Sequence, residues 1–187
     1  MVLAEKYGDL PLRLLLVGHN PSEHSWESGH YFSQPSNNFW KLITESGLLE
    51  ADVEANDDSM LEKMQIGFTD VIRVPNSNSS VISRAYFKEQ RNFFYNRIRD
   101  NAHRVGAPPE RIAFVGKRQF SMLFDPPLKS VDLGLQFVGP PEFPFNTEIW
   151  VLSTPSGRSP MKWEERLQPY MELAQTMQSA FTTSNIE

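Results

Sequence analysis

Residues 12–22 read LRLLLVGHNPS, an apolar run followed by a polar turn. The run Leu12–Val17 is short and nearly continuous, and it ends at Gly18. A run of this kind is typical of a strand that is buried on both faces, as strands of parallel sheets are. We therefore predict a buried strand at Leu12–Val17, followed by a loop that begins at Gly18.

Apolar segments and helical patterns alternate along the rest of the chain. Apolar or strand-like segments follow at Ile66–Val74, Ile112–Val115, Leu135–Val138 and Glu148–Leu152, and helices are predicted at Asn38–Ser46, within residues 50–64, at Ser83–His103, from Gly116 to Phe124 and after Ser159. Strands that alternate with helices favour a parallel sheet covered on both faces. The expected fold class is α/β, a three-layer sandwich with a central, mainly parallel sheet.

The C-terminal part of the chain predicts one more helix. Ser159 is its expected N-cap, with Pro160 at the first helical position. Pro169 should kink or interrupt this helix, and residues from about Thr182 should be frayed. Because neither a repeat nor a linker marks a second domain, we expect one domain over residues 1–187, with its core between about 12 and 174.

Composition excludes several classes of protein. The chain has 187 residues, of which 40% are hydrophobic, enough for one well-buried core. It lacks an apolar run of about 18 residues, so we expect no membrane association. Glu5, Lys6 and Asp9 interrupt the N-terminal segment, which therefore does not resemble a signal peptide. The chain has no cysteine, which excludes disulfides and thiolate-bound metals.

From the same composition we expect an intracellular monomer without metal or cofactor, in the nucleus of a eukaryote or the cytoplasm of a bacterium. The net charge of −5 argues mildly against a nucleic-acid partner. However, the charge is uneven: Arg84–Arg118 holds nine basic residues against three acids, whereas Glu45–Asp70 holds eight acids against Lys63 alone. One basic face could meet an anionic partner, but a solvated charged helix explains the pattern equally well.

Two polar loops follow predicted strands, at Gly18–Asn37 and Ser153–Pro160. In parallel α/β sheets, ligands bind beyond the carboxyl ends of the strands, so these loops are where chemistry is expected. The first loop is long for a connection between a strand and a helix. Taken alone, Asn20 is a common turn residue, Phe39 and Trp40 fit a helix core, and Arg158 fits a solvated turn.

The motifs carry more information together than apart. In chain order they are GHNP (18–21), GHYF (29–32), PSNNFW (35–40), IGFTD (66–70), FVGK (114–117) and PSG (155–157). This order resembles the mismatch-specific uracil-DNA glycosylases and the catalytic domain of thymine-DNA glycosylase, over about residues 12–174. The resemblance implies a uracil-DNA glycosylase-like fold. It also implies an enzyme, a monofunctional DNA N-glycosylase that flips a mispaired or damaged pyrimidine out of double-stranded DNA and hydrolyses its bond to the sugar.

The resemblance also implies roles for individual residues. Asn20 would be the catalytic residue that positions the attacking water, and Phe32 would stack on the flipped base. The remaining base-binding positions would be His19, Ser25 and Tyr31, and the DNA-binding positions Gly157, Arg158, Ser159 and Lys117. Arg158 would be the wedge that enters the duplex beside the widowed guanine.

Some residues depart from the family pattern. His19 stands at a position that is usually aliphatic, and Ser22 at one that is usually glycine. Ser25 and Tyr31 replace an alanine and a histidine of the thymine-processing enzymes, so we expect uracil to be favoured over thymine. Glu23 and Glu27 could assist the water, although solvated loop acids are the better interpretation. His24 and His30 are expected to make structural contacts only.

Other classes of protein fit less well. A serine hydrolase would need a histidine in the C-terminal part of the chain, and none follows His103. Nucleotide-binding glycine motifs are absent from the sequence. The remaining alternative is a non-catalytic module that binds DNA lesions on the same scaffold. A test for abasic sites in a G·U duplex separates this module from an enzyme.

Overall fold

The computed structural model of the chain describes residues 3–78 and 81–184. In this part of the chain, one sheet has the strand order β2-β1-β3-β5-β4. The strands are β1 (Leu14–Gly18), β2 (Ile66–Asp70), β3 (Arg111–Val115), β4 (Gly134–Gln136) and β5 (Glu148–Leu152). All neighbouring pairs are parallel except β4 and β5, which are antiparallel. The sheet is therefore mainly parallel, as predicted.

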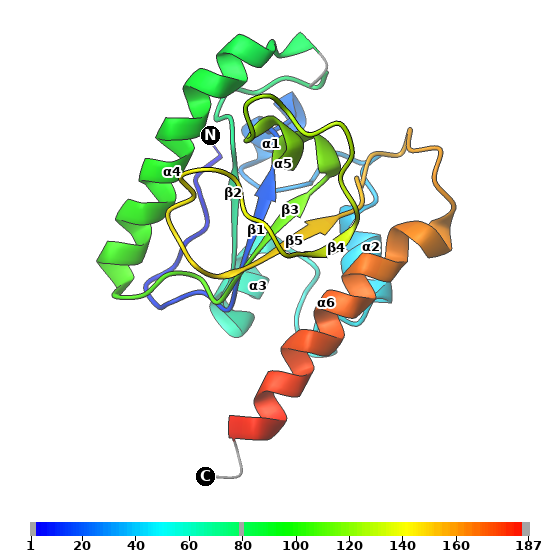
Figure 1. Cartoon of the computed structure of the whole chain (residues 1–187). Coiled ribbons are helices and arrows are strands. Elements are labelled where there is room, and N and C mark those ends of the chain that lie inside the picture. The colour runs from blue at the N-terminus through cyan, green and yellow to red at the C-terminus, as the bar shows by residue number, and fades with distance from the viewer. Residues whose placement is uncertain (1–2, 79–80, 185–187) are drawn as a thin grey trace.

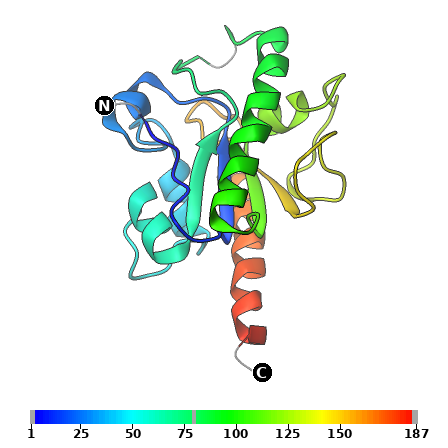
Figure 2. The ribbon, with the colours of Figure 1, turned by 90° about the vertical axis from the view of Figure 1, so that its left-hand side faces the viewer.

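Helices cover both faces of this sheet (Figures 1 and 2). One face packs against α2 (Phe39–Glu45), α3 (Asp57–Met64) and α6 (Trp163–Ser184), and the other against α4 (Arg84–Val105) and α5 (Lys117–Met122). These layers confirm the α/β sandwich. Within the described ranges, no helix is both long enough and apolar enough to cross a membrane.

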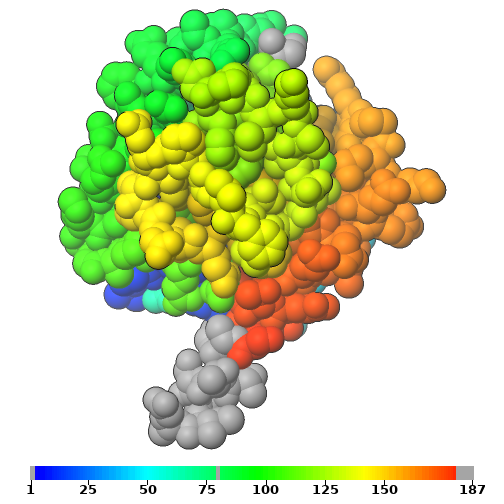
Figure 3. All heavy atoms as spheres, in the orientation of Figure 1, coloured from blue at the N-terminus to red at the C-terminus, as the bar shows by residue number. Residues whose placement is uncertain are grey.

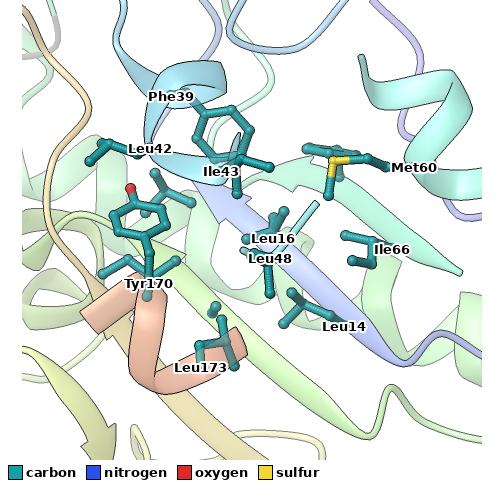
Figure 4. Packing of buried hydrophobic residues seen from close by; sticks show 14 of the residues in the cluster. Leu14, Leu16, Phe39, Leu42, Ile43, Leu48, Met60, Ile66, Tyr170 and Leu173 are labelled. Atoms are coloured by element: carbon teal, nitrogen blue, oxygen red, sulfur yellow. The ribbon is translucent and has the colours of Figure 1, made fainter. Parts of the chain in front are cut away.

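Burial of β1 on both faces follows directly from its sequence. Leu14 and Leu16 belong to the core beneath α2, α3 and α6, whereas Leu15 and Val17 belong to the core beneath α4 and α5. Successive side chains of a strand point to opposite faces, so a continuous apolar run supplies both cores at once. Figure 4 shows Leu14 and Leu16 packed with residues of the surrounding helices.

The first long loop contains a helix that the sequence did not predict, α1 (Glu23–Ser28). The Ser22 side chain accepts a hydrogen bond from the Ser25 amide and caps this helix, and Gly29 ends it in the left-handed region at φ 77°. At φ −72°, Ser22 adopts an ordinary extended conformation, so this turn does not need the glycine of the family pattern.

Several element boundaries differ from the prediction by one or two residues, and three differences concern the site or the edge of the sheet. β2 ends at Asp70 rather than Val74, because the amides of Val71 and Ile72 turn to donate to the carbonyls of the Gly18–His19 turn. The edge strand β4 is three residues long and excludes Phe137 and Val138, which are exposed. The third difference is at the start of α6.

Ser159 is not the N-cap of the last helix, which begins at Trp163. The Ser159 amide donates to the Ser156 carbonyl, and its hydroxyl accepts from the Met161 amide, so it belongs to the preceding turn. Pro169 lies inside α6 and does not interrupt it. The segment from Thr182, predicted to be frayed, overlaps the end of this helix, and residues 185–187 lie outside the described residues.

Candidate active site

A cavity of about 580 Å³ opens at the carboxyl ends of the parallel strands. Its lining comes from the turn after β1, from α1 and the loop behind it, from the end of β2 and the loop behind it, and from the turn after β5. The predicted residues among them are His19, Asn20, Ser25, Tyr31, Phe32, Gly157 and Arg158. Loops that are distant in the sequence therefore meet at one edge of the sheet, where α/β proteins bind ligands.

The Asn20 side chain is held in one orientation by backbone groups. Its Nδ2 donates to the carbonyls of Asn76 at 2.8 Å and Pro21 at 3.0 Å, with Val74 at 3.4 Å. The side-chain oxygen of Asn20 could not replace Nδ2 here, because it would face carbonyl oxygens. The hydrogen-bond network therefore determines which side-chain atom is nitrogen and which is oxygen. Oδ1 must be the atom on the other side, where it lies 2.9 Å from Nδ1 of His19. Asn20 presents an acceptor rather than a donor on that side.

Phe32 lies in the cavity wall with an uncommon backbone conformation, at φ 53°. Non-glycine residues rarely adopt positive φ, and those that do are held there by their surroundings. Phe32 stacks on Phe39 of α2 with the ring centroids 3.9 Å apart and the planes at 18°. Phe39 itself is fully buried, so the sequence interpretation of Phe39 as a core residue is confirmed.

Tyr31 and Ser25, two more of the predicted base-binding residues, are both buried and hydrogen bonded. The Tyr31 hydroxyl accepts from Nη1 of Arg73 at 2.6 Å, and the Tyr31 amide donates to Asp57. The Ser25 hydroxyl lies 3.1 Å from that of Ser22. These contacts hold the Tyr31 and Ser25 side chains in place in the cavity wall.

Asp70 is a cavity residue that the sequence reasoning missed. It ends β2 beside Gly18 of β1 and is almost completely buried. A Cβ atom on Gly18 would lie 2.1 Å from Oδ1 of Asp70, so a larger residue at position 18 would force the Asp70 carboxyl to move. The other carboxyl oxygen of Asp70, Oδ2, lies 3.4 Å from Nη1 of Arg73. The available signal was an acid at the carboxyl end of an apolar strand.

Burial raises the pKa of the Asp70 carboxyl from 3.8 to about 7. Arg73 opposes this shift, Glu5 adds to it and Arg97 opposes it, in decreasing order. Burial outweighs the two cations because a charge loses its hydration in the interior. Near neutral pH the carboxyl can therefore act as a donor or as an acceptor.

The turn after β5, which lies at the surface (Figure 3, orange), is hydrogen bonded to α6 and to the residue before α2. Nη2 of Arg166 donates to the carbonyls of Thr154 and Ser156 at 3.1 Å each, and the Asn38 amide donates to the Pro155 carbonyl. Gly157 passes so close to the Ser36 carbonyl that a Cβ atom would lie 2.6 Å from its oxygen. Arg158 is exposed at the rim of the cavity, whereas Ser159 is not part of its lining. Sequence reasoning missed Arg166.

Lys117 lies apart from this cavity, at the start of α5, where it lines a second cavity of about 370 Å³. Glu23 and Glu27 are exposed and do not line the main cavity. The Glu23 carboxylate instead accepts from the Ser77 hydroxyl. Neither acid is therefore placed to act on a ligand in this cavity.

Among the described residues, His30, Asp57 and Asp58 lie close enough together to share a metal ion. However, Asp57 already accepts hydrogen bonds from the Tyr31 amide, the Asp58 amide and the His30 ring. The cluster therefore ties the GHYF segment to α3, which accounts for His30 as a structural contact.

Taken together, the fold and site define an α/β protein with a cavity large enough for a small ligand, lined by an aromatic ring, an oriented amide and a buried acid. A sequence model of the uracil DNA glycosylase superfamily matches residues 5–178. The chain belongs to this superfamily, whose members are DNA glycosylases, hydrolases of base excision repair.

We predict that Asp70→Asn changes how stability depends on pH. Between pH 3.8 and about 7 the folded state binds a proton at Asp70 that the unfolded state has released, so the free energy of unfolding falls as pH rises through this window. Asparagine does not titrate. The melting temperature of the variant, relative to the parent, should therefore be higher at about pH 8 than at about pH 5.

Asp125→Asn is the matched control for this experiment. Lys88 and Arg84 hold the pKa of the exposed Asp125 carboxyl below its ordinary value, so it stays ionised across the same window. Its melting difference should not change with pH. A pH-independent difference for Asp70→Asn would contradict the raised pKa.

Proposed function

We propose that this protein excises uracil from mispaired positions in double-stranded DNA, as a monofunctional glycosylase without a cofactor. The observation that carries the proposal is the Asn20 amide, held among backbone carbonyls with Oδ1 as its remaining acceptor in a cavity of about 580 Å³. Enclosed sites of roughly 300–1,000 Å³ are usual for small ligands.

A base within a duplex cannot reach such a cavity, so the nucleotide must first be flipped out. Flipping costs a few kcal/mol and is least costly for a mispaired base, which favours the mismatch as substrate. Stacking of the base on Phe32 would return about 1–3 kcal/mol. The rigid support of Phe32 by Phe39 fits this role, because an aromatic ring fixed in advance loses little freedom on binding.

The proposed reaction breaks the bond between N1 of the base and C1′ of the sugar, and its electron pair leaves with the base. A water oxygen then bonds to C1′, and its proton passes to solvent. Because the sugar carries positive character, the water needs positioning more than deprotonation. Oδ1 of Asn20 would accept one hydrogen of this water and direct its oxygen at C1′.

Asp70 is the group we propose to face the Watson–Crick edge of the base, together with backbone amides. A protonated carboxyl can donate to a base carbonyl while its other oxygen accepts from N3–H. The donor would stabilise the charge that develops on the leaving base. Preference for uracil over thymine is supported by the fixed positions of Ser25 and Tyr31, which leave these two side chains little freedom to move aside for a methyl group.

Arg158 would enter the duplex in place of the flipped nucleotide, with Gly157 and Ser159 shaping its turn. The anchoring of this turn by Arg166 supports the role, since a wedge needs a rigid base. Lys117 is proposed to contact a DNA phosphate, because it is exposed at the start of α5.

We predict that Asn20→Ala lowers the rate of uracil excision from a G·U duplex by about 100-fold or more, because the water loses its acceptor. The measurement is single-turnover excision followed by alkaline cleavage at the abasic site. Asn96→Ala, which removes an exposed amide of α4, is the matched control and should excise at the parent rate.

Binding and melting must be measured on the same Asn20 variant, because its amide also holds the carbonyls of Val74 and Asn76. Parent-like excision by Asn20→Ala would refute the role of Asn20. If the parent itself binds G·U duplex and leaves no abasic site, the protein is the non-catalytic lesion-binding module instead.

We predict that Arg158→Ala reduces excision from duplex DNA about tenfold and excision from single-stranded DNA much less. Only the duplex requires a residue to fill the vacated stack, at a cost of a few kcal/mol. Rates on both substrates are compared with those of Arg104→Ala, a variant of another exposed arginine, which bonds to Asp9. An equal loss on both substrates would argue against a wedge.

A further inference from the structure

His19 lies between the cavity and the hydrophobic core beneath α4. Its ring packs against Phe87 of α4 with the centroids 5.3 Å apart, and its backbone carbonyl accepts from the Ile72 amide at 3.0 Å. His19 belongs to the lining of both the main cavity and the second one. Fixed from behind in this way, the imidazole has little freedom to reorient.

The contacts of Asn20 determine which atom carries the proton of His19. Because Nδ2 of Asn20 faces carbonyls, its Oδ1 faces the imidazole, and an acceptor there requires a donor opposite. Nδ1 of His19 is therefore protonated. Nε2 is buried and has no hydrogen-bond partner among the described residues.

Electrostatics agree with this tautomer. Burial lowers the pKa of His19 to about 4, against a smaller opposing effect of the hydrogen bond with Asn20, and Arg118 lowers it further. The ring is thus neutral near pH 7, with a single N–H, and that N–H points at Asn20. A neutral donor is available there at every pH at which the enzyme would work.

We propose that His19 is a positioning residue for Asn20: its Nδ1–H donates to Oδ1 of Asn20 and holds the amide plane, leaving the second lone pair of Oδ1 for the attacking water. This inference rests on the proposed function and adds the group that sets the geometry of the water. Backbone carbonyls hold the nitrogen side of the amide, and His19 holds the oxygen side.

The His19 ring makes two distinct contacts: it packs against Phe87 and it faces Oδ1 of Asn20. An aliphatic side chain could pack against Phe87 equally well but could not donate. The packing of His19 against Phe87 and its hydrogen bond with Asn20 can therefore be separated by substitution.

Three variants separate them. His19→Phe keeps a ring against Phe87 and removes the donor. His19→Asn removes the ring but places an N–H near the position of Nδ1, whereas His19→Gln places one near the position of Nε2. Each variant is tested with a G·U duplex for single-turnover excision at saturating enzyme, for affinity, and for melting temperature without DNA.

We expect His19→Phe to excise about 10- to 100-fold more slowly, with affinity and melting temperature close to those of the parent, because a slightly misplaced water lowers only the chemical step. His19→Asn should recover a substantial part of the rate and His19→Gln should not. In the Asn20→Ala background, His19→Phe should have no further effect, since coupled residues are not additive.

The outcomes distinguish this inference from the proposed function. If Asn20→Ala excises like the parent, the proposed function fails. If Asn20→Ala is inactive but His19→Phe keeps the parent rate, only the role of His19 fails. Equal losses in all three His19 variants, with lowered melting temperatures, would show a packing role and overturn the inference.

Discussion

Burial of β1 on both faces fixes the position of this strand and of the turn that follows it. Its side chains alternate between two cores, and its backbone pairs with β2 on one side and β3 on the other. A strand enclosed in this way cannot shift its register without moving apolar side chains out of both cores. The turn after Gly18 therefore leaves the sheet at a fixed place, and the cavity is built around that turn.

The close contact between Gly18 and Asp70 links the fixed position of β1 to the cavity, since both residues belong to the cavity lining. Because there is no Cβ at position 18, the Asp70 carboxyl can lie against the backbone of β1 in nearly complete burial. The same burial raises the pKa of Asp70 to about 7. The absence of a side chain at position 18 thus makes room for the Asp70 carboxyl in the cavity wall, and the burial of that carboxyl raises its pKa. The amide of Asn20 is oriented by backbone groups, since every acceptor around its nitrogen is a backbone carbonyl.

The turn after β5 is positioned from a different direction. Arg166 of α6 binds two of its carbonyls, and Ser153 and Tyr170 link the end of β5 to α6. These bonds hold residues 153–162 in a turn, and α6 begins only at Trp163. Tertiary hydrogen bonds therefore overrode the local capping signal of Ser159, and they explain why that prediction was wrong.

The amino-acid sequence was enough to predict the α/β class, the buried strands and the two loops that line the cavity, because apolar periodicity and turn residues are local properties of a chain. It also singled out Asn20, Phe32 and Arg158 through the order of its motifs. The hydrogen bonds of Asn20 with Val74 and Asn76, the place of Asp70 and the anchoring of the turn after β5 by Arg166 became visible in the folded chain alone. The contacts of Asn20 and Asp70 join residues more than 50 positions apart, and those of Arg166 join a helix to the turn before it; their geometry depends on strand order and packing, which no local pattern encodes.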